Sequence, residues 1–297
     1  MKRTVSIAAI VLFCLCGNLF SLDEDFCSKI NNLKWIAYSP TNFNPIKGVC
    51  PLPVSIKDDL ALLHRVGFNG IITYGSQEIL MDIPKIARES GFEGVIMGIW
   101  NFKDEQEVDN AVKMAEYVDG YCVGNEGLSL RYEVDELIKA IENVKAKTNK
   151  PVTTTEEIND YAKRYMVELG DWIFPNAHPY FSNAKSPYEA ARWVKKHYQI
   201  IKRGAPENKP ILFKEVGLPT RGDSGCSQRR QKEFFILMEQ SEVNFAYFEA
   251  FDQYWKRHHS VEPYWGLFDK KRQPKKFAYG KLNKDKKYAQ SHIRNRN

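Results

Sequence analysis

Residues 94–100 (GVIMGIW) and residues 120–124 (GYCVG) are two short apolar runs, and a longer amphipathic stretch separates them. The same alternation recurs along the chain after Leu33 and is typical of parallel β/α units. The apolar runs predict eight strands, at residues 35–38, 70–74, 94–100, 120–124, 151–155, 171–174, 210–213 and 244–248.

Helical patterns lie between these runs. Residues 56–66 carry Leu60, Leu63 and Val66 on one face, and residues 134–144 repeat this periodicity. Eight such units within roughly 250 residues are what a closed barrel requires. A doubly wound sheet, the alternative, would more often show a glycine-rich first turn. We therefore predict an α/β fold consisting of a single (β/α)8 TIM barrel.

Composition and charge narrow the functional classes. The 297 residues are 43% hydrophobic and 13% aromatic, which is enough for a sizeable core and argues against disorder. The net charge of +6 is uneven, because residues 270–297 hold eleven Lys and Arg against one Asp, which leaves −4 for residues 1–269. A nucleic-acid groove needs its basic residues in the folded body, so we expect no nucleic-acid partner.

The N-terminus has the layout of a signal peptide. Lys2 and Arg3 precede a mostly apolar run at residues 5–20, and acidic residues follow at 23–25. The run is shorter than the ~20 apolar residues of a spanning helix. We predict a signal peptide at residues 1–21, with an uncleaved signal-anchor as the alternative, and a secreted, periplasmic or cell-envelope location.

The remaining chain is predicted to form one domain at residues 22–283. A closing helix at residues 274–282 should cover the last strand, and residues 284–297 should be a disordered basic tail. We expect a monomer with no integral membrane span once the signal has been cleaved.

Four cysteines lie outside the signal segment, namely Cys27, Cys50, Cys122 and Cys226. Their spacing matches no zinc pattern, and we expect neither a metal nor a cofactor. Export permits disulfides, and the pairing we favour joins Cys27 to Cys50. Cys122 lies in an apolar strand and is interpreted as a core residue.

Side chains at the carboxyl ends of the strands should form the active site of such a barrel. These positions hold aromatic, amide and carboxylate groups: Tyr38, Tyr74, Trp100, Asn125, Glu126, Asn176, Tyr180, Glu215, Glu249 and Trp255. Sugars need aromatic platforms and hydrogen-bonding partners, so we predict a carbohydrate ligand. Each tyrosine can instead support a glutamate, each tryptophan can be packing, and Glu249 can pair with a cation. Motifs for zinc proteases, serine hydrolases and P-loop proteins are absent from the sequence.

Two glutamates stand out because each closes an apolar strand and is followed within two residues by a glycine. Glu126 follows the fourth predicted strand and Glu215 the seventh, so both should face the barrel mouth. Hydrolysis with retention needs carboxyl groups ~5 to 5.5 Å apart, whereas inversion needs ~6.5 to 9.5 Å. Glu156 and Glu157 open a predicted helix, where acidic residues are favoured structurally.

Six segments resemble glycoside hydrolase family 17 in order and spacing: residues 35–40 (WIAYSP), 123–126 (VGNE), 174–181 (FPNAHPYF), 214–220 (KEVGLPT), 248–256 (FEAFDQYWK) and 264–268 (YWGLF). That family contains retaining β-1,3-glucanases and glucan transglycosylases on a (β/α)8 barrel. The resemblance implies that Glu126 is the acid/base and Glu215 the nucleophile. It also implies that Asn125 binds the sugar 2-hydroxyl and that Lys256 belongs to the substrate site.

The chain departs from the family pattern near the nucleophile. Lys214 stands where many members have a small residue, and we expect its side chain to face the helices. Leu218 replaces an aromatic residue, and Tyr254 stands where bacterial members often have proline. The predicted function is a retaining hydrolase of β-1,3-glucan. A glucan transglycosylase and a non-catalytic carbohydrate-binding barrel are the alternatives.

Overall fold

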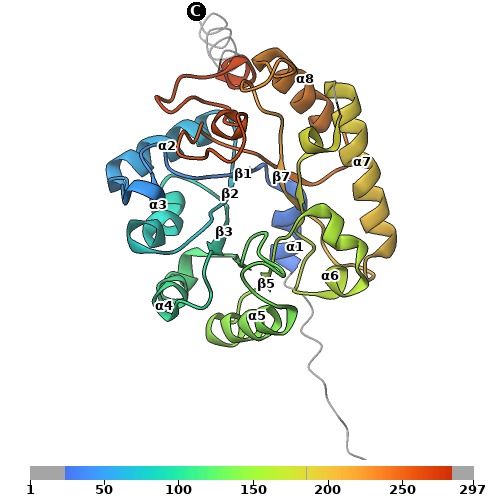
Figure 1. Ribbon diagram of the computed structural model, residues 1–297. Helices are drawn as coiled ribbons and strands as arrows, with labels where there is room; N and C mark the ends of the chain where they lie inside the picture. The colour runs from blue at the N-terminus through green and yellow to red at the C-terminus, as the bar shows by residue number, and fades with distance from the viewer. Residues whose placement is uncertain (1–23, 185, 283–297) are drawn as a thin grey trace, which may run out of the picture.

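The centre of the molecule is a sheet of short strands: β1 (Trp35–Ala37), β2 (Gly70–Ile72), β3 (Gly94–Ile99), β4 (Gly120–Val123), β5 (Val152–Thr153), β6 (Asn176–Ala177), β7 (Phe213–Val216) and β8 (Phe245–Tyr247). They pair in parallel in the order β5-β4-β3-β2-β1-β8-β7-β6. A parallel bridge between Glu157 and Asn176 joins the two ends of this order. The computed structural model describes residues 24–184 and 186–282. The sheet curls into a ring inside the helices (Figure 1), which confirms the predicted (β/α)8 barrel.

The helices are α1 (Glu24–Asn32), α2 (Pro53–Arg65), α3 (Ile83–Glu89), α4 (Glu105–Lys113), α5 (Val134–Thr148), α6 (Arg164–Glu168), α7 (Pro187–Gly204) and α8 (Gln228–Glu239). Their ends follow from local sequence. A capping box between Ser186 and Glu189, with proline at the first helical position, starts α7. Asn149 ends α5 in the left-handed conformation, with φ +53°.

Two strands lie later in the chain than the apolar runs that predicted them. Residues 171–174 and 210–213 were predicted as strands, but β6 and β7 begin at Asn176 and Phe213. Trp172 and Phe174 are instead fully buried in a cluster with Phe26 of α1. The strand pairs are more polar, with Asn176 opposite Glu215. The apolar runs that predicted these two strands therefore lie toward the bottom of the barrel. More polar residues continue the sheet from there toward the mouth.

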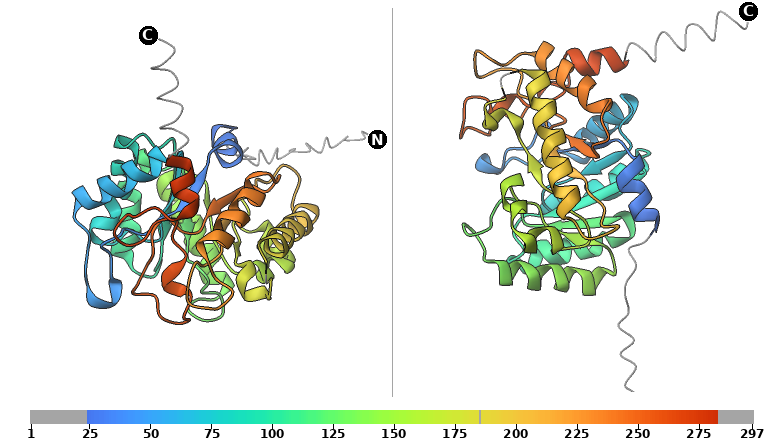
Figure 2. Two further views of the ribbon diagram at one scale, coloured as in Figure 1. Left: turned by 90° about the horizontal axis from the view of Figure 1, so that it is seen from above. Right: turned by 90° about the vertical axis from the view of Figure 1, so that its right-hand side faces the viewer.

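The sequence did not predict α1, which covers the barrel end where the strands begin. Phe26 and Ile30 are buried there, and the Phe26 ring lies 4.9 Å from that of Trp172. Lys29 Nζ lies 2.9 Å from Asp119 Oδ1, just ahead of β4. Figure 2 shows α1 on the side of the molecule away from the loops that follow the strands. The helix therefore closes the bottom of the barrel.

The predicted closing helix is confirmed, since residues 276–282 are helical and Phe277 and Ala278 are buried against the core. Two of the basic residues counted in residues 270–297 form ion pairs within the folded domain. Arg272 Nε lies 2.6 Å from Asp59 Oδ1 on α2, and Lys275 Nζ lies 2.6 Å from Asp252 Oδ1. The predicted signal peptide and the tail from residue 284 onward lie outside the described residues.

The predicted disulfide between Cys27 and Cys50 is wrong. Cys27 lies on α1 at the bottom of the barrel, whereas Cys50 lies in the loop between β1 and α2 at the mouth end. Cys50 is a free thiol whose Sγ lies 2.6 Å from Oε2 of Glu78. Cys122 is buried in the core, as predicted.

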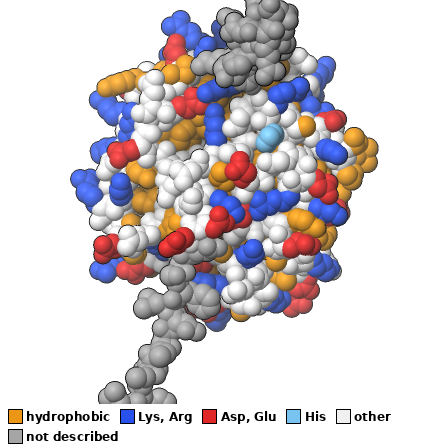
Figure 3. All heavy atoms as spheres, turned by 180° about the vertical axis from the view of Figure 1, so that it is seen from behind, with side chains coloured by type: hydrophobic (Ala, Val, Ile, Leu, Met, Phe, Trp, Pro, Cys, Tyr) orange, Lys and Arg blue, Asp and Glu red, His pale blue; other side chains and the backbone are white. Residues whose placement is uncertain are grey.

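The outer surface mixes charges of both signs. On the face opposite that of Figure 1, Lys and Arg side chains alternate with Asp and Glu (Figure 3). None of the helices in residues 24–184 and 186–282 is both long and apolar enough to cross a bilayer.

Candidate active site

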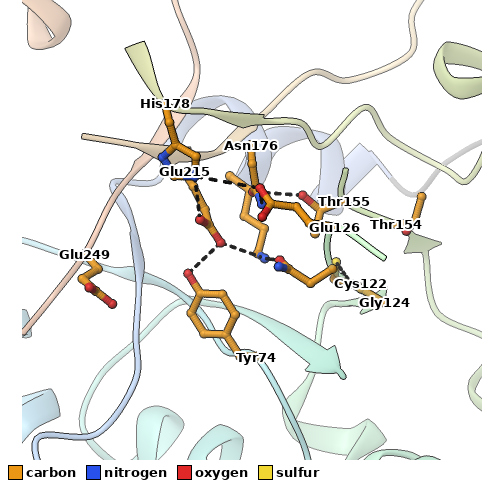
Figure 4. A network of polar contacts seen from close by, with 12 residues as sticks. Tyr74, Cys122, Gly124, Glu126, Thr154, Thr155, Asn176, His178, Glu215 and Glu249 are labelled. Atoms are coloured by element: carbon orange, nitrogen blue, oxygen red, sulfur yellow. Dashed lines mark hydrogen bonds and ion pairs between the residues drawn. The ribbon is translucent and has the colours of Figure 1, made fainter. Parts of the chain in front are cut away.

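Glu126 reaches the mouth through a sharp turn after β4. Gly124 and Glu126 both have positive φ, of +75° and +48°. A Cβ atom on Gly124 would lie 2.4 Å from the hydroxyl of Tyr132, so only glycine fits. The amide of Glu126 donates to the carbonyl of Thr155 at 3.0 Å, which fixes the turn against β5. Its carboxylate Oε1 accepts a 2.7 Å hydrogen bond from Asn176 Nδ2 (Figure 4).

Glu215 lies in β7 and is buried, with three groups around its carboxylate. The Tyr74 hydroxyl donates to Oε1 at 2.9 Å, and His178 Nε2 lies 3.1 Å from Oε2 (Figure 4). Lys214 Nζ lies 3.2 Å from Oε1. Glu215 is therefore held in one orientation by donors on both oxygens.

The two glutamates are neighbours across the mouth. One carboxylate oxygen of Glu126, one of Glu215 and a ring nitrogen of His178 all lie within 4.8 Å of one another. These three residues could also hold a cation, but the ammonium group of Lys214 already supplies positive charge beside Glu215.

The environments of the two carboxyl groups shift their pKa values in opposite directions. Burial raises the pKa of Glu126, and the negative charge of Glu215 raises it further. Burial alone would also raise the pKa of Glu215, but the charges of Lys214 and His178 and the hydrogen bond from His178 outweigh it and bring it to about 2. Over a wide pH range, Glu215 is thus ionised while Glu126 retains a proton.

His178 is a site residue to which the sequence analysis gave no role. Burial lowers the pKa of its imidazole, but the hydrogen bond and charge of Glu215 reverse this and raise it. Its Nε2 lies 3.1 Å from Glu215 and 3.9 Å from Glu126. His178 directly follows β6, and the available signal was the alternation of side chains extended one residue past this strand, because a residue two positions after Asn176 in an extended chain shares its face.

Lys214 was expected to face the helices, and this expectation is wrong. The side chain points into the mouth, where Nζ contacts Glu215 and donates a short hydrogen bond to Asn125 Oδ1. The pairing of β7 with β8 shifts register between Phe213 and Val216. Such a bulge lets two consecutive side chains reach the same side of a strand, which simple alternation does not predict.

Glu249 and Lys256 form a second charged pair at the end of β8. Glu249 is fully buried, and its Oε2 lies 2.8 Å from Lys256 Nζ. Burial raises the pKa of Glu249 to about 7. Its other carboxylate oxygen, Oε1, is buried without a hydrogen-bond partner.

The predicted aromatic residues separate into two groups. The Tyr74 hydroxyl donates a hydrogen bond to Glu215. Trp100 lies at the rim of the mouth and is 44% exposed, and the Arg131 guanidinium lies 4.5 Å from the centroid of its ring. Trp255 is partly exposed and donates from Nε1 to Gln253 at 2.8 Å. These three residues belong to the mouth or its edge.

The other two aromatic residues lie away from the glutamates. Tyr38 is 1% exposed, and its hydroxyl donates to Asp59 of α2 at 3.0 Å, so its predicted sugar contact is wrong. Tyr38 instead supports the ion pair between Asp59 and Arg272. Tyr180 donates to Asp223 at 2.8 Å, beside a hollow that is separate from the carboxylates.

Glu156 has the structural role that was predicted, although by a different contact. It is buried and accepts hydrogen bonds from the Tyr132 hydroxyl at 2.7 Å and from the Leu128 amide at 3.2 Å. Glu157 precedes a short 3-10 helix at Ile158–Ala162.

A hollow of about 420 Å³ opens beside Glu126 and is also lined by His178, Phe181, His259, Glu262 and Trp265, among others.

Comparison with known proteins identifies the family. The model of the BtgE/BtgC glycoside hydrolase domain matches residues 36–266. The chain belongs to this glycoside hydrolase family. The resemblance to family 17 inferred from the sequence is thereby confirmed.

Curated relatives of this BtgE/BtgC domain include fungal proteins. The chain is 28% identical over 260 residues to "Probable beta-glucosidase btgE" of Aspergillus clavatus, covering 79% of this chain and 45% of the relative. It is 25% identical to "Probable family 17 glucosidase SCW10" of Saccharomyces cerevisiae, covering 79% and 64%. "Cell surface mannoprotein MP65" of Candida albicans is 26% identical, covering 79% and 66%. The chain spans between about half and two thirds of these relatives' lengths.

Solved structures share the fold. An endo-laminarinase from Formosa Hel1_33_131 superposes with a TM-score of 0.74 at 18% identity, covering 89% of this chain and 90% of that one. The Cryptomeria japonica pollen β-1,3-glucanase CJP38 superposes with a TM-score of 0.61 at 18% identity, covering 82% and 97%. These likenesses establish the barrel architecture of glycoside hydrolases.

Proposed function

We propose that the chain is a retaining glycosidase that cleaves β-1,3-glucan by double displacement. Glu215 is the nucleophile and Glu126 is the acid/base. The observation that carries the proposal is the pair of carboxyl groups within 4.8 Å of one another, whose pKa values are shifted in opposite directions. The limit of 4.8 Å joins one oxygen of Glu126 to one oxygen of Glu215, and this closeness favours the ~5 to 5.5 Å spacing of retaining enzymes over the ~6.5 to 9.5 Å spacing of inverting ones.

The reaction has two steps. Glu215 attacks the anomeric carbon while Glu126 gives its proton to the glycosidic oxygen, so the bond to the leaving sugar breaks and a covalent glycosyl-enzyme forms. Glu126, now ionised, then takes a proton from water, which attacks the same carbon and releases Glu215. Tyr74 and His178 hold the nucleophile in place through both steps.

Several features support a glucan as the substrate. The family match and the names of the relatives point to β-glucosidases and β-1,3-glucanases. Trp100 and Trp255 supply aromatic surface near the mouth, and the Glu249–Lys256 pair lies beside the nucleophile. The cell-surface relative and the signal-like N-terminus support export to the cell envelope.

The test is product analysis on laminari-oligosaccharides with stereochemistry followed by NMR. We expect the β-anomer to form first, and we expect Glu126→Gln and Glu215→Gln each to lose at least roughly 10³-fold in turnover. Azide should partly rescue Glu215→Ala and yield an α-glycosyl azide. An initial α-anomer, or near-native turnover by Glu215→Gln, would contradict the assignment.

The same experiment separates the alternatives. Products longer than the substrate indicate that a sugar acceptor replaces water, and glucose alone indicates attack from a chain end. Binding without turnover indicates a carbohydrate-binding barrel, which the paired glutamates argue against.

A further inference from the structure

Lys214 is a buried cation at the centre of the mouth. Its side chain is 2% exposed, and its Nζ lies between the Asn125 amide oxygen and the Glu215 carboxylate. The same Nζ lies 4.4 Å from the centroid of the Tyr74 ring. An ammonium group has three donors and no acceptor. Two oxygens and one ring face therefore satisfy Lys214 within the protein, without a ligand.

This contact fixes the amide of Asn125. Because Lys214 can only donate, the amide must turn its Oδ1 toward the ammonium and its Nδ2 away from it. A small hydroxyl residue at this position could donate or accept, and would not impose one orientation. Asn125 directly precedes Glu126 and is largely buried, so its amide is a fixed donor next to the acid/base.

We propose that Lys214 is a positioning residue that couples Asn125 to Glu215, so that Asn125 donates Nδ2 to the 2-hydroxyl of the sugar being transferred. The inference rests on the proposed function, since it requires a glycosyl group at Glu215. The contact of Asn125 with the 2-hydroxyl is what the family resemblance implies, and the new element is the dependence of this contact on Lys214. Hydrogen bonds to this hydroxyl strengthen in the transition state.

Lys214 also affects the enzyme through its charge alone, and the two effects can be separated. The charge acts on Glu215 whichever sugar is bound, whereas the positioning effect acts only when a 2-hydroxyl is present. A substrate that lacks this hydroxyl therefore isolates the charge effect.

The experiment compares an aryl β-laminaribioside with the analogue that lacks the 2-hydroxyl on the aryl-bearing sugar. We expect Lys214→Met to lower kcat/KM on the first substrate by roughly 10²-fold and on the second by roughly 10-fold or less. In the Asn125→Ala background, Lys214→Met should have the same effect on both substrates, because the coupled partner is gone. Lys214→Gln keeps a donor but loses the charge, and because its amide can also accept, it should retain more of the 2-hydroxyl discrimination than Lys214→Met but less than the parent.

Lys256→Met is the matched control. It also removes a partly buried cation near Glu215, but Lys256 pairs with Glu249. Its effect should add to that of Asn125→Ala. Thermal midpoints establish that each variant folds, and if Lys214→Met fails to fold, the cycle is run with Lys214→Gln.

Equal losses on both substrates, or additivity of Lys214→Met with Asn125→Ala, would overturn the inference and leave the proposed function intact. If the unaltered enzyme hydrolyses neither substrate and also leaves laminari-oligosaccharides intact, the proposed function fails and the inference fails with it.

Discussion

Glu126 and Glu215 are chemically identical side chains that the barrel makes different. Glu215 has donors on both oxygens, whereas Glu126 has one hydrogen bond from Asn176 and a negatively charged neighbour. The donors favour the ionised form of Glu215, and burial with repulsion favours the protonated form of Glu126. The opposite pKa shifts of the two carboxyl groups follow from these contacts.

This difference predicts the pH profile of kcat/KM. The acidic limb reports ionisation of Glu215, whose pKa is about 2, and should therefore lie well below the ordinary glutamate value. The basic limb reports loss of the Glu126 proton and should lie above that value. Initial rates from about pH 2 to about pH 8 would test this, and both limbs are macroscopic values of a coupled pair. Activity that is independent of pH across this range would contradict the assignment.

Glu126 should also limit stability. Its pKa is raised in the folded state, so the contribution of its protonated form is full below the unfolded pKa and is lost as pH rises through the folded pKa. Glu126→Gln removes this loss and keeps an oxygen for Asn176. We expect the variant to melt at a higher temperature than the parent at pH 7 and at the same temperature below the unfolded pKa. A gain of equal size at both pH values would point to packing instead.

Both glutamates could be predicted from the sequence because each combines a strand end with a following glycine. Lys214 and His178 could not, for different reasons. Lys214 reaches the mouth only because β7 has an irregular register, and His178 directly follows β6, a strand that the apolar pattern placed too early in the chain. Tyr38 was assigned to the site because it follows β1, yet its hydroxyl turns outward to Asp59.

At the scale of elements, the segment after β8 is held to the barrel by buried charges. Arg272 joins this segment to Asp59 on α2, and Lys275 joins it to Asp252. The Lys275 ammonium also donates a hydrogen bond to the Thr220 hydroxyl. Asp59 is fully buried and would lose its ionic partner if Arg272 were removed. These contacts depend on the folded path of the chain, so residue types alone did not reveal them.

Removing this ionic partner should be costly. Arg272→Ala should destabilise the fold by about 3 kcal/mol, because an unpaired buried carboxylate remains. Urea unfolding would measure the change. Arg229→Ala on α8, which breaks an exposed pair with Glu233, is the matched control and should leave the midpoint unchanged. Similar midpoints for both variants would show that the pair with Asp59 is dispensable.

At the scale of the whole molecule, one helix at each end of the described chain covers part of the barrel. α1 covers the bottom with Phe26, and residues 276–282 cover the last strand with Phe277. The rule that each barrel strand is followed by a covering helix predicted the second cover but not the first, since α1 precedes the first strand and begins within the acidic stretch assigned to the start of the mature chain. The strand count was predictable because each β/α unit repeats the same pattern.

The boundary of the folded domain can be tested by truncation. Deleting residues 284–297 should leave kcat and the thermal midpoint nearly unchanged, because the contacts described above end by residue 282. Phe277→Ala should instead cost ~3 to 5 kcal/mol, as expected for a buried aromatic side chain. Calorimetry and initial rates on the same samples would measure both changes. A collapse of the truncated chain would place part of its stability beyond residue 283.

The position of α1 also sets which way the enzyme faces when it is immobilised. This helix begins at Glu24 on the side away from Glu126 and Glu215, so a bead or sensor chip coupled ahead of Glu24 leaves the cleft open to solution. Polymer chains too large to diffuse beneath the protein can still enter from the free side. Coupling through surface lysines has no such bias, and would turn part of the population toward the support.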